Sequence, residues 1–156
     1  MKAVRKELKI KGIKNGIVID HIKPGLCFKI FNHLKLEKSL NTTMVISNID
    51  SSSRGRKDIL KVEGEDIKVN YLELALISPN STLDIVKHEQ IVEKVRLTLP
   101  DKIESVIKCP NKRCITNDEA CKNIFTKLKD RESYTCKYCD HIIDVDKGVI
   151  FVESED

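Results

Sequence analysis

The sequence predicts an α+β fold built in two parts, and three observations carry this prediction. Strand-like and helix-like apolar patterns alternate over residues 1–100, whereas residues 101–156 contain only short apolar runs that are typical of strands. Four cysteines stand in two tight pairs within the second part. A chain of 156 residues has room for one domain or two small ones. We therefore expect a larger domain over 1–100 and a smaller one over 101–156.

The elements of the first part follow the order of a split βαβ domain. We expect a strand over 16–22, a helix over about 24–36, a strand over 42–47, an exposed loop or hairpin tip over 48–58, a strand over 58–62, a short helix between Asn70 and Pro79, and strands over 82–86 and 91–97. Strand, helix, strand, strand, helix, strand, with one strand added, predicts a ferredoxin-like domain with an antiparallel sheet and two helices.

The second part reads as a small antiparallel β unit. Leu99-Pro100-Asp101 is typical of a domain boundary, and the apolar runs beyond it cover 103–107, 124–125, 142–145 and 149–152. A unit of this size has too few residues to bury a self-sufficient core, so it requires a staple.

Cys109, Cys114, Cys136 and Cys139 supply such a staple, with the spacing C-x4-C-x21-C-x2-C. Each close pair can clamp one side of a tetrahedral ion, and four thiolates suit Zn²⁺. Because the protein fills all four positions, we expect one structural Zn²⁺ per chain and no catalytic site. Iron in the same sulfur cage is the main alternative, and Cys121 could replace one ligand. CKYC alone would also suit a dithiol redox enzyme, an interpretation that the second cysteine pair weakens.

The charge is divided unevenly between the two parts. Residues 1–100 carry 18 Lys and Arg against 12 Asp and Glu, whereas residues 101–156 carry 10 against 12. Binding to phosphate backbones needs an excess of Lys and Arg. The cysteine-rich part therefore favours a module that docks on protein over a nucleic-acid-binding zinc ribbon, which stays the alternative.

The sequence also bears on the cellular compartment. No apolar run approaches the roughly 18–20 residues of a membrane span, and the basic N-terminus lacks the apolar region of a secretory signal. Six cysteines in a chain that lacks such a signal favour a reducing, cytoplasmic location without a membrane partner.

Basic residues of the first part form a candidate anion site. Lys57 and Lys61 stand an even number of residues apart, so on a strand both point to one face. With Asp20 and His21 on the first expected strand and Lys94 on the last, they could surround a small anion such as a nucleoside triphosphate. A solvated charged face is the simpler interpretation. The sequence has neither GxxxxGK[ST] nor GxGxxG, so a P-loop or Rossmann site is excluded.

Five segments together resemble the regulatory chains of aspartate carbamoyltransferase. They are GIVIDHI (16–22), GRKDILK (55–61), LALISPNST (74–82), LP (99–100) and CPNKRCI…CKYC (109–139). The resemblance implies a non-catalytic subunit whose N-terminal domain binds CTP and UTP as inhibitors and ATP as activator. It implies a zinc domain that docks on the catalytic chains, and regulatory homodimers that bridge catalytic trimers in the control of pyrimidine biosynthesis.

The same resemblance implies roles for individual residues. Lys94 and His21 would face the phosphates, Asp20 and Lys61 would lie near the ribose, Lys57 would line the site, Ile13 and Glu89 would offer main-chain groups to the base, and Ile10, Lys11 and Val18 would lie beside them.

Three residues depart from the pattern of the best-known members. Lys11 replaces an acidic residue, Glu89 a tyrosine and Asp84 an asparagine, and the segment 64–70 is one residue shorter. The preference among effectors therefore does not follow from the resemblance.

Overall fold

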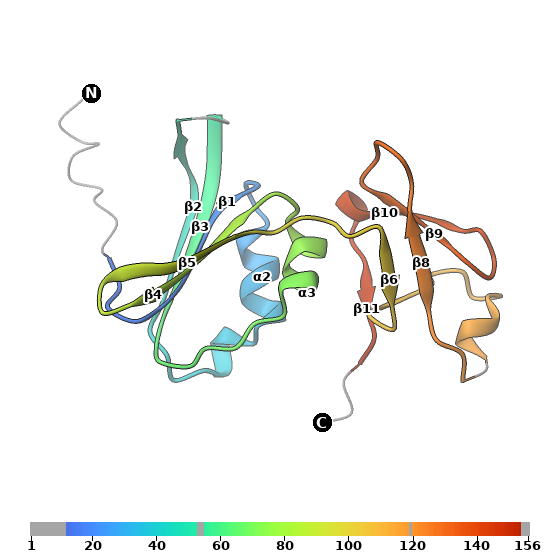
Figure 1. Cartoon of the computed structure of the whole chain (residues 1–156), viewed down its shortest axis with the longest axis horizontal. Helices are drawn as coiled ribbons and strands as arrows, with labels where there is room; N and C mark the ends of the chain where they lie inside the picture. Colours follow the sequence, from blue (N-terminus) through green and yellow to red (C-terminus); the bar gives the residue numbers. More distant parts are fainter. Residues whose placement is uncertain (1–11, 53–54, 119, 154–156) are drawn as a thin grey trace. The chain divides into compact units, whose positions relative to one another are not determined.

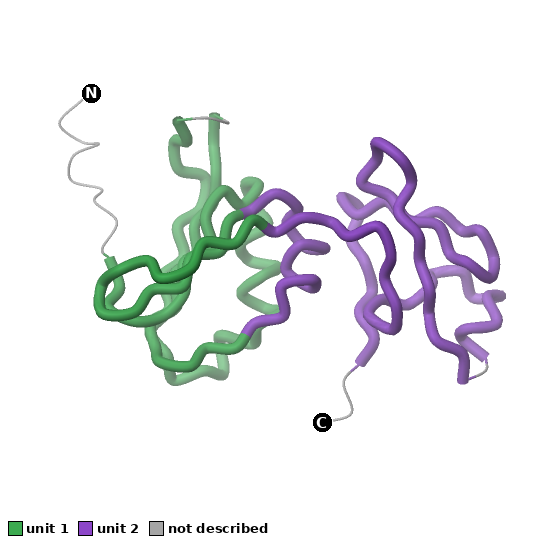
Figure 2. Tube along the Cα trace, in the orientation of Figure 1, with its two compact units in different colours: residues 1–68, 82–96 green, residues 69–81, 97–156 purple. Residues whose placement is uncertain are grey.

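The computed structural model describes residues 12–52, 55–118 and 120–153, and it divides into two compact units (Figure 2). The first unit is drawn from residues 1–68 and 82–96, and the second unit from residues 69–81 and 97–156. The chain therefore passes between the units three times. The predicted functional division into 1–100 and 101–156 stays a prediction, because the segment 69–81 groups with the second unit.

The first unit is built on a five-stranded antiparallel sheet in the order β2-β3-β1-β4-β5 (Figure 1). Its elements are β1 (Gly16–Ile22), α2 (Cys27–His33), a short 3₁₀ helix (Leu36–Lys38), β2 (Thr43–Ser51), β3 (Gly55–Glu63), β4 (Thr82–Lys87) and β5 (Gln90–Arg96), with α3 (Tyr71–Ile77) between β3 and β4 in the chain. This strand order confirms the predicted ferredoxin-like fold, with β5 as the added strand.

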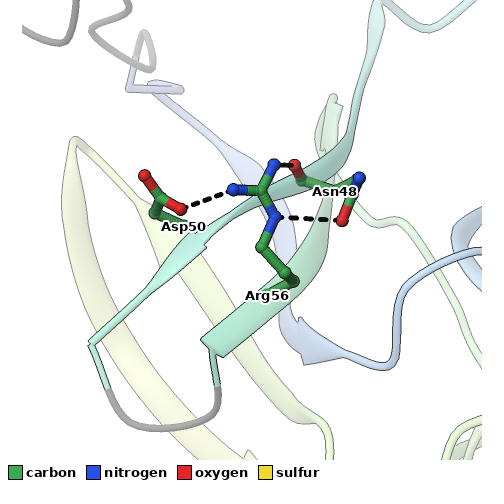
Figure 3. Close-up of polar contacts among 3 residues, drawn as sticks. All are labelled: Asn48, Asp50 and Arg56. Atoms are coloured by element: carbon green, nitrogen blue, oxygen red, sulfur yellow. Dashed lines mark hydrogen bonds and ion pairs between the residues drawn. The ribbon is translucent and has the colours of Figure 1, made fainter. Parts of the chain in front are cut away.

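The predicted loop over 48–58 is wrong in extent, because most of it is strand. β2 continues to Ser51 and β3 begins at Gly55. The Arg56 side chain reaches across this hairpin (Figure 3). Its Nε donates to Asn48 Oδ1 at 3.1 Å, one terminal nitrogen contacts Asp50 Oδ1 at 2.5 Å, and the other donates to the Asn48 carbonyl. Backbone pairing therefore continues through this polar end of the two strands, and the Arg56 side chain spans it.

A buried carboxylate fixes the start of α2 and a bulge in β2. Asp58 is fully buried, and its Oδ2 accepts the backbone N–H groups of Gly25 at 2.7 Å and Cys27 at 3.3 Å. Its Oδ1 accepts the N–H of Asn48 at 2.6 Å, where the β2–β3 register shifts. The helix predicted from residue 24 therefore begins only at Cys27, after a turn held by Asp58.

Gly16 on β1 lies against the backbone of β3. Its φ is +145°, and a Cβ built there would lie 2.0 Å from the carbonyl oxygen of Val62 on β3. We expect Gly16→Ala to lower the free energy of unfolding by about 3 kcal/mol, through overpacking and backbone strain together. Hydrogen exchange of the β1 amides under increasing denaturant measures this loss.

Gly25→Ala is the matched control for this prediction. Gly25 also has a positive φ, +93°, but an added Cβ there meets nothing within 4 Å. The Gly25→Ala variant should therefore lose only about 1 kcal/mol of unfolding free energy, from the strain of a positive φ. Equal losses in the two variants would show that the β1–β3 contact is not what requires glycine.

The second unit contains two small antiparallel sheets and α3. Its strands are β6 (Lys102–Glu104), β7 (Ile107–Lys108), β8 (Ile124–Lys127), β9 (Ser133–Cys136), β10 (Ile142–Asp144) and β11 (Ile150–Phe151), in the orders β10-β9-β8-β6 and β11-β7. Two 3₁₀ helices cover Ile115–Asn117 and Val145–Lys147. This confirms the small antiparallel β unit, although no strand had been expected at β9.

The helix α3 contributes to the core of this second unit. Its N-terminus is capped by Asn70, whose side chain accepts the Glu73 N–H at 3.1 Å. Leu76 on α3 is buried in one cluster with Phe125 and Tyr134. The remaining buried members of the cluster are Ile103, Ile107, Cys109, Cys114, Cys136, Ile143 and Val145. The second core is thus assembled from segments far apart in the sequence.

Across residues 12–52, 55–118 and 120–153, no helix is long and apolar enough to span a bilayer.

Candidate metal centre and effector site

The four paired cysteines converge on one point. The sulfur atoms of Cys109, Cys114, Cys136 and Cys139 all lie within 4.8 Å of one another. Cys109 and Cys139 are 3.5 Å apart at Sγ, and Cys114 and Cys136 are 3.7 Å apart. Four sulfurs at about 2.3 Å from a tetrahedral ion stand about 3.8 Å from each other. The cluster therefore has the dimensions of a four-coordinate metal centre.

Two turns bring the cysteine pairs to this point. Cys109 follows β7, and the Asn117 side chain donates to its carbonyl at 3.1 Å and to the Asn111 carbonyl at 2.8 Å. Cys136 ends β9, and the Asp140 N–H returns to its carbonyl at 2.9 Å, which closes the turn that carries Cys139. Each ligand-bearing loop is thus held by hydrogen bonds within the loop, from a side chain in the first and from the backbone in the second.

The sulfur environments differ within the cluster. Burial raises the pKa of the Cys109 and Cys136 thiols above the ordinary value of 9.0. At Cys139 burial acts in the same direction, but hydrogen bonds from the Asn111 side chain and the His141 backbone outweigh it and lower the pKa to about 7. Burial thus favours the neutral thiols of Cys109 and Cys136, and a bound cation would favour their thiolates.

The two other cysteines stand apart from this cluster. Cys121 is half-buried and does not belong to the group of converging sulfurs, so the described residues assign it no ligand role. Cys27 is fully buried at the start of α2 in the first unit.

The lysines predicted to bind an anion lie on one face of the five-stranded sheet. Lys94 on β5 pairs directly with Asp84 on β4, Asp84 with Val18 on β1, and Val18 with Lys61 on β3. Directly opposed residues of antiparallel strands carry their side chains on the same face. We call these four residues the charged row. It brings together Val18, Lys61 and Lys94 from three strands.

Next to the charged row lie Asp20 and His21. Lys57 Nζ contacts Asp20 Oδ1 at 2.9 Å, and His21 Nδ1 lies 3.0 Å from Thr82 Oγ1. Burial opposes ionisation of Asp20, but hydrogen bonds from Lys57 and from the His21 backbone hold its pKa below the ordinary 3.8. Burial lowers the pKa of Lys61 from 10.5, and the charge of Asp20 offsets part of this effect. Lys57 therefore forms an ion pair with Asp20, which the even spacing of Lys57 and Lys61 in the sequence did not indicate.

A cavity of about 550 Å³ opens beside the charged row. Its wall includes Ile13, Lys61 and Glu89, three of the predicted residues, and the other lining residues are Gly12, Lys14, Thr42, Met44 and Glu63. The volume is typical of a small-molecule site. The Glu89 N–H is donated to the Lys14 carbonyl at 2.8 Å, so of its two main-chain groups Glu89 could offer a base only the carbonyl.

The structure thus divides the predicted effector residues into two groups. Lys61 belongs to both the charged row and the cavity, and it links them. Asp20, His21, Lys57 and Lys94 do not line the cavity, while Ile10 and Lys11 lie outside the described residues. Sequence reasoning missed Thr82 and Met44, because only the strand register reveals that they face the site.

Comparison with known proteins agrees with this two-part organisation. Residues 8–98 match the family model of the aspartate carbamoyltransferase regulatory chain, allosteric domain, and residues 101–148 match that of its metal binding domain. The aspartate carbamoyltransferase regulatory chain of Clostridium tetani is 45% identical over 140 residues, covering 88% of this chain and 97% of the relative.

Two further relatives carry the same name. The protein of Clostridium botulinum is 47% identical over 137 residues, 86% of this chain and 93% of its own length. That of Methanococcus vannielii is 41% identical over 139 residues, 88% of this chain and 93% of its own length. This likeness extends through both units and identifies a regulatory chain, not a catalytic subunit. The chain belongs to the family of aspartate carbamoyltransferase regulatory chains.

Proposed function

We propose that this chain senses nucleotides on the open face of its five-stranded sheet and passes the signal to catalytic chains of aspartate carbamoyltransferase. One observation carries the proposal. Lys61 joins a row of strand-borne charges to a cavity of about 550 Å³, and both lie within the region that matches an allosteric domain. Phosphates would lie over Lys94 and His21, with the base in the cavity beside Ile13 and Glu89.

The effectors would be CTP and UTP as inhibitors and ATP as activator. Each would shift the partner's activity by binding one quaternary state more tightly than the other. Calorimetric titration of CTP, UTP and ATP into the metal-loaded full chain tests this. Binding of at least one in the micromolar to millimolar range supports the proposal, and binding of none overturns it.

Lys94→Ala should weaken triphosphate binding about tenfold to a hundredfold, because a charge-assisted phosphate contact is worth roughly 1.5–3 kcal/mol. Lys29→Ala is the matched control, since Lys29 is exposed on α2 and lies outside both the charged row and the cavity. Titration with the nucleotide that binds most tightly compares the two variants. Equal losses of nucleotide affinity in the two variants would show that Lys94 contributes only to the net positive charge of the chain.

We propose Zn²⁺ as the resident ion of the four cysteines, one per chain. The support is the all-sulfur donor set at tetrahedral spacing, which leaves no protein-free position for a reacting group. The ion would hold the two turns together and do no chemistry. Metal analysis of protein purified without added metal tests the assignment. Iron in the same cage would give a coloured protein.

The second unit would dock on the catalytic chains, and regulatory chains would pair as homodimers that bridge catalytic trimers. Two exposed apolar side chains support the proposed docking surface. Ile115 follows Cys114, Tyr138 precedes Cys139, and each side chain is 44% exposed. Apolar side chains on loops fixed by a metal are suited to a protein contact. Co-sedimentation with catalytic trimers, with and without chelator, tests it.

A further inference from the structure

The charged row contains a carboxylate that the effector site does not need for binding phosphate. Asp84 lies between Val18 and Lys94 in direct cross-strand register, so its side chain shares their face. Its Oδ1 is shielded from solvent and has no hydrogen-bond partner among the described residues. A shielded carboxylate oxygen without a donor is costly, so it is expected to influence whatever occupies the face.

The charge balance of this face shows what that influence is. Lys57, Lys61 and Lys94 are opposed by the carboxylates of Asp20 and Asp84, and Lys57 is already in contact with Asp20 at 2.9 Å. Arg96, which pairs with Thr82, and Glu63, which stands two residues after Lys61, add one charge of each sign to this face, so the cations of these seven residues exceed the carboxylates by one. A free triphosphate brings several negative charges to the same surface, and the neighbouring carboxylate repels each of them.

We propose that Asp84 sets the charge selectivity of the effector site, limiting how much uncompensated phosphate charge the site accepts. The inference rests on the proposed function, since it concerns the same site. Each added phosphate gains a contact with Lys94 and meets the carboxylate beside it. The increase in affinity from mono- to triphosphate is therefore smaller than the lysines alone would give, and a divalent cation on the phosphates relieves the repulsion.

The test compares the full, metal-loaded chain with Asp84→Asn, which keeps the shape of the side chain and removes its charge. Adenosine and cytidine mono-, di- and triphosphates are titrated calorimetrically at fixed ionic strength, first without free divalent cations. The ratio of triphosphate to monophosphate affinity should rise about five- to tenfold in the variant. Added Mg²⁺ should shrink this difference to within about twofold.

Glu93→Gln provides the matched control. Glu93 precedes Lys94 on β5 and pairs with Ile85, so its side chain points to the opposite face of the same two strands. Replacing it with glutamine changes the net charge by the same amount as Asp84→Asn. Its affinity ratio should stay within about twofold of the unmodified chain. An unchanged ratio in Asp84→Asn, or an equal rise in Glu93→Gln, overturns the inference while leaving nucleotide binding intact. Absence of any nucleotide binding in all three proteins overturns the proposed function itself.

Discussion

Replacing Cys114 with serine is expected to unfold the second unit while the sheet of the first unit stays folded. Cys109, Cys114 and Cys136 belong both to the sulfur cluster and to the buried core around Phe125 and Tyr134. The strands around that core are only two to four residues long. A structural metal in such a unit supplies about 10–16 kcal/mol of apparent binding free energy, which exceeds what a core of this size provides.

The tyrosines allow this loss to be measured in one unit alone. The chain has three tyrosines and no tryptophan, and Tyr71, Tyr134 and Tyr138 all belong to the second unit. Near-ultraviolet circular dichroism of tyrosine therefore reports on the second unit. Its signal and the bound metal should be lost together in Cys114→Ser, and a chelator should have the same effect on the unmodified chain.

Cys121→Ser is the control for this experiment, because Cys121 lies outside the converging sulfurs. It should keep one metal ion per chain and the full tyrosine signal. A folded, metal-loaded Cys114→Ser protein would show that the cluster is not the element on which the second unit depends. Metal loss in Cys121→Ser would revive the hypothesis that Cys121 is a ligand.

The second large effect is expected from Asp58→Asn, which should lower the free energy of unfolding of the first unit by about 4 kcal/mol. Asp58 is fully buried and accepts the N–H groups of Gly25, Cys27 and Asn48. An amide in its place turns an N–H₂ group toward buried donors, and each unsatisfied donor costs roughly 1–3 kcal/mol. Hydrogen exchange of the β1 and β3 amides measures the loss, with the tyrosine signal unchanged.

The effect of Asp58 should depend on pH. Burial opposes ionisation, but hydrogen bonds from Cys27 and from the backbone hold its pKa below the ordinary 3.8 in the folded state. A carboxyl group whose native pKa is depressed stabilises the fold fully above its unfolded pKa, and this contribution is lost as the pH falls through the native pKa. The stability difference between the unmodified chain and Asp58→Asn should therefore be constant above pH 3.8 and narrow below it.

Asp50→Asn serves as the control for both measurements. Asp50 contacts Arg56 at 2.5 Å, but both side chains are about half exposed, with relative areas of 54% and 50%. Exposed ion pairs contribute about 0–1 kcal/mol, so this change should be nearly silent. A loss at Asp50 as large as that at Asp58 would place the critical contact in the hairpin rather than at the buried carboxylate.

Much of the fold follows from local patterns in the sequence, and the errors have physical causes. The β-branched strand over 16–22 and the short helix after Asn70 are confirmed because both depend on neighbours in sequence. The loop predicted over 48–58 is mostly strand, because Arg56 and the buried Asp58 support polar backbone pairing that hydrophobic periodicity does not reveal. β9 was missed because Tyr134 is its only large apolar residue.

The candidate sites divide in the same way. The spacing of the four cysteines was sufficient to predict their convergence, because short loops restrict where a close pair can lie. Even spacing placed Lys57 and Lys61 on one strand face, but only the register shows that Asp84 stands beside Lys94. The apolar stripe of α3 was visible in the sequence, yet a stripe does not indicate which core it joins.

The placement of α3 also has a consequence for how the protein is made. Leu76 is translated before every other buried member of its cluster, which spans residues 103–145. A chain leaves the ribosome from its N-terminus at about 5–20 residues per second. Leu76 must therefore wait several seconds, after β3 has emerged, until β8 and β9 exist to cover it. During this interval a side chain that the finished fold buries completely is exposed to other chains.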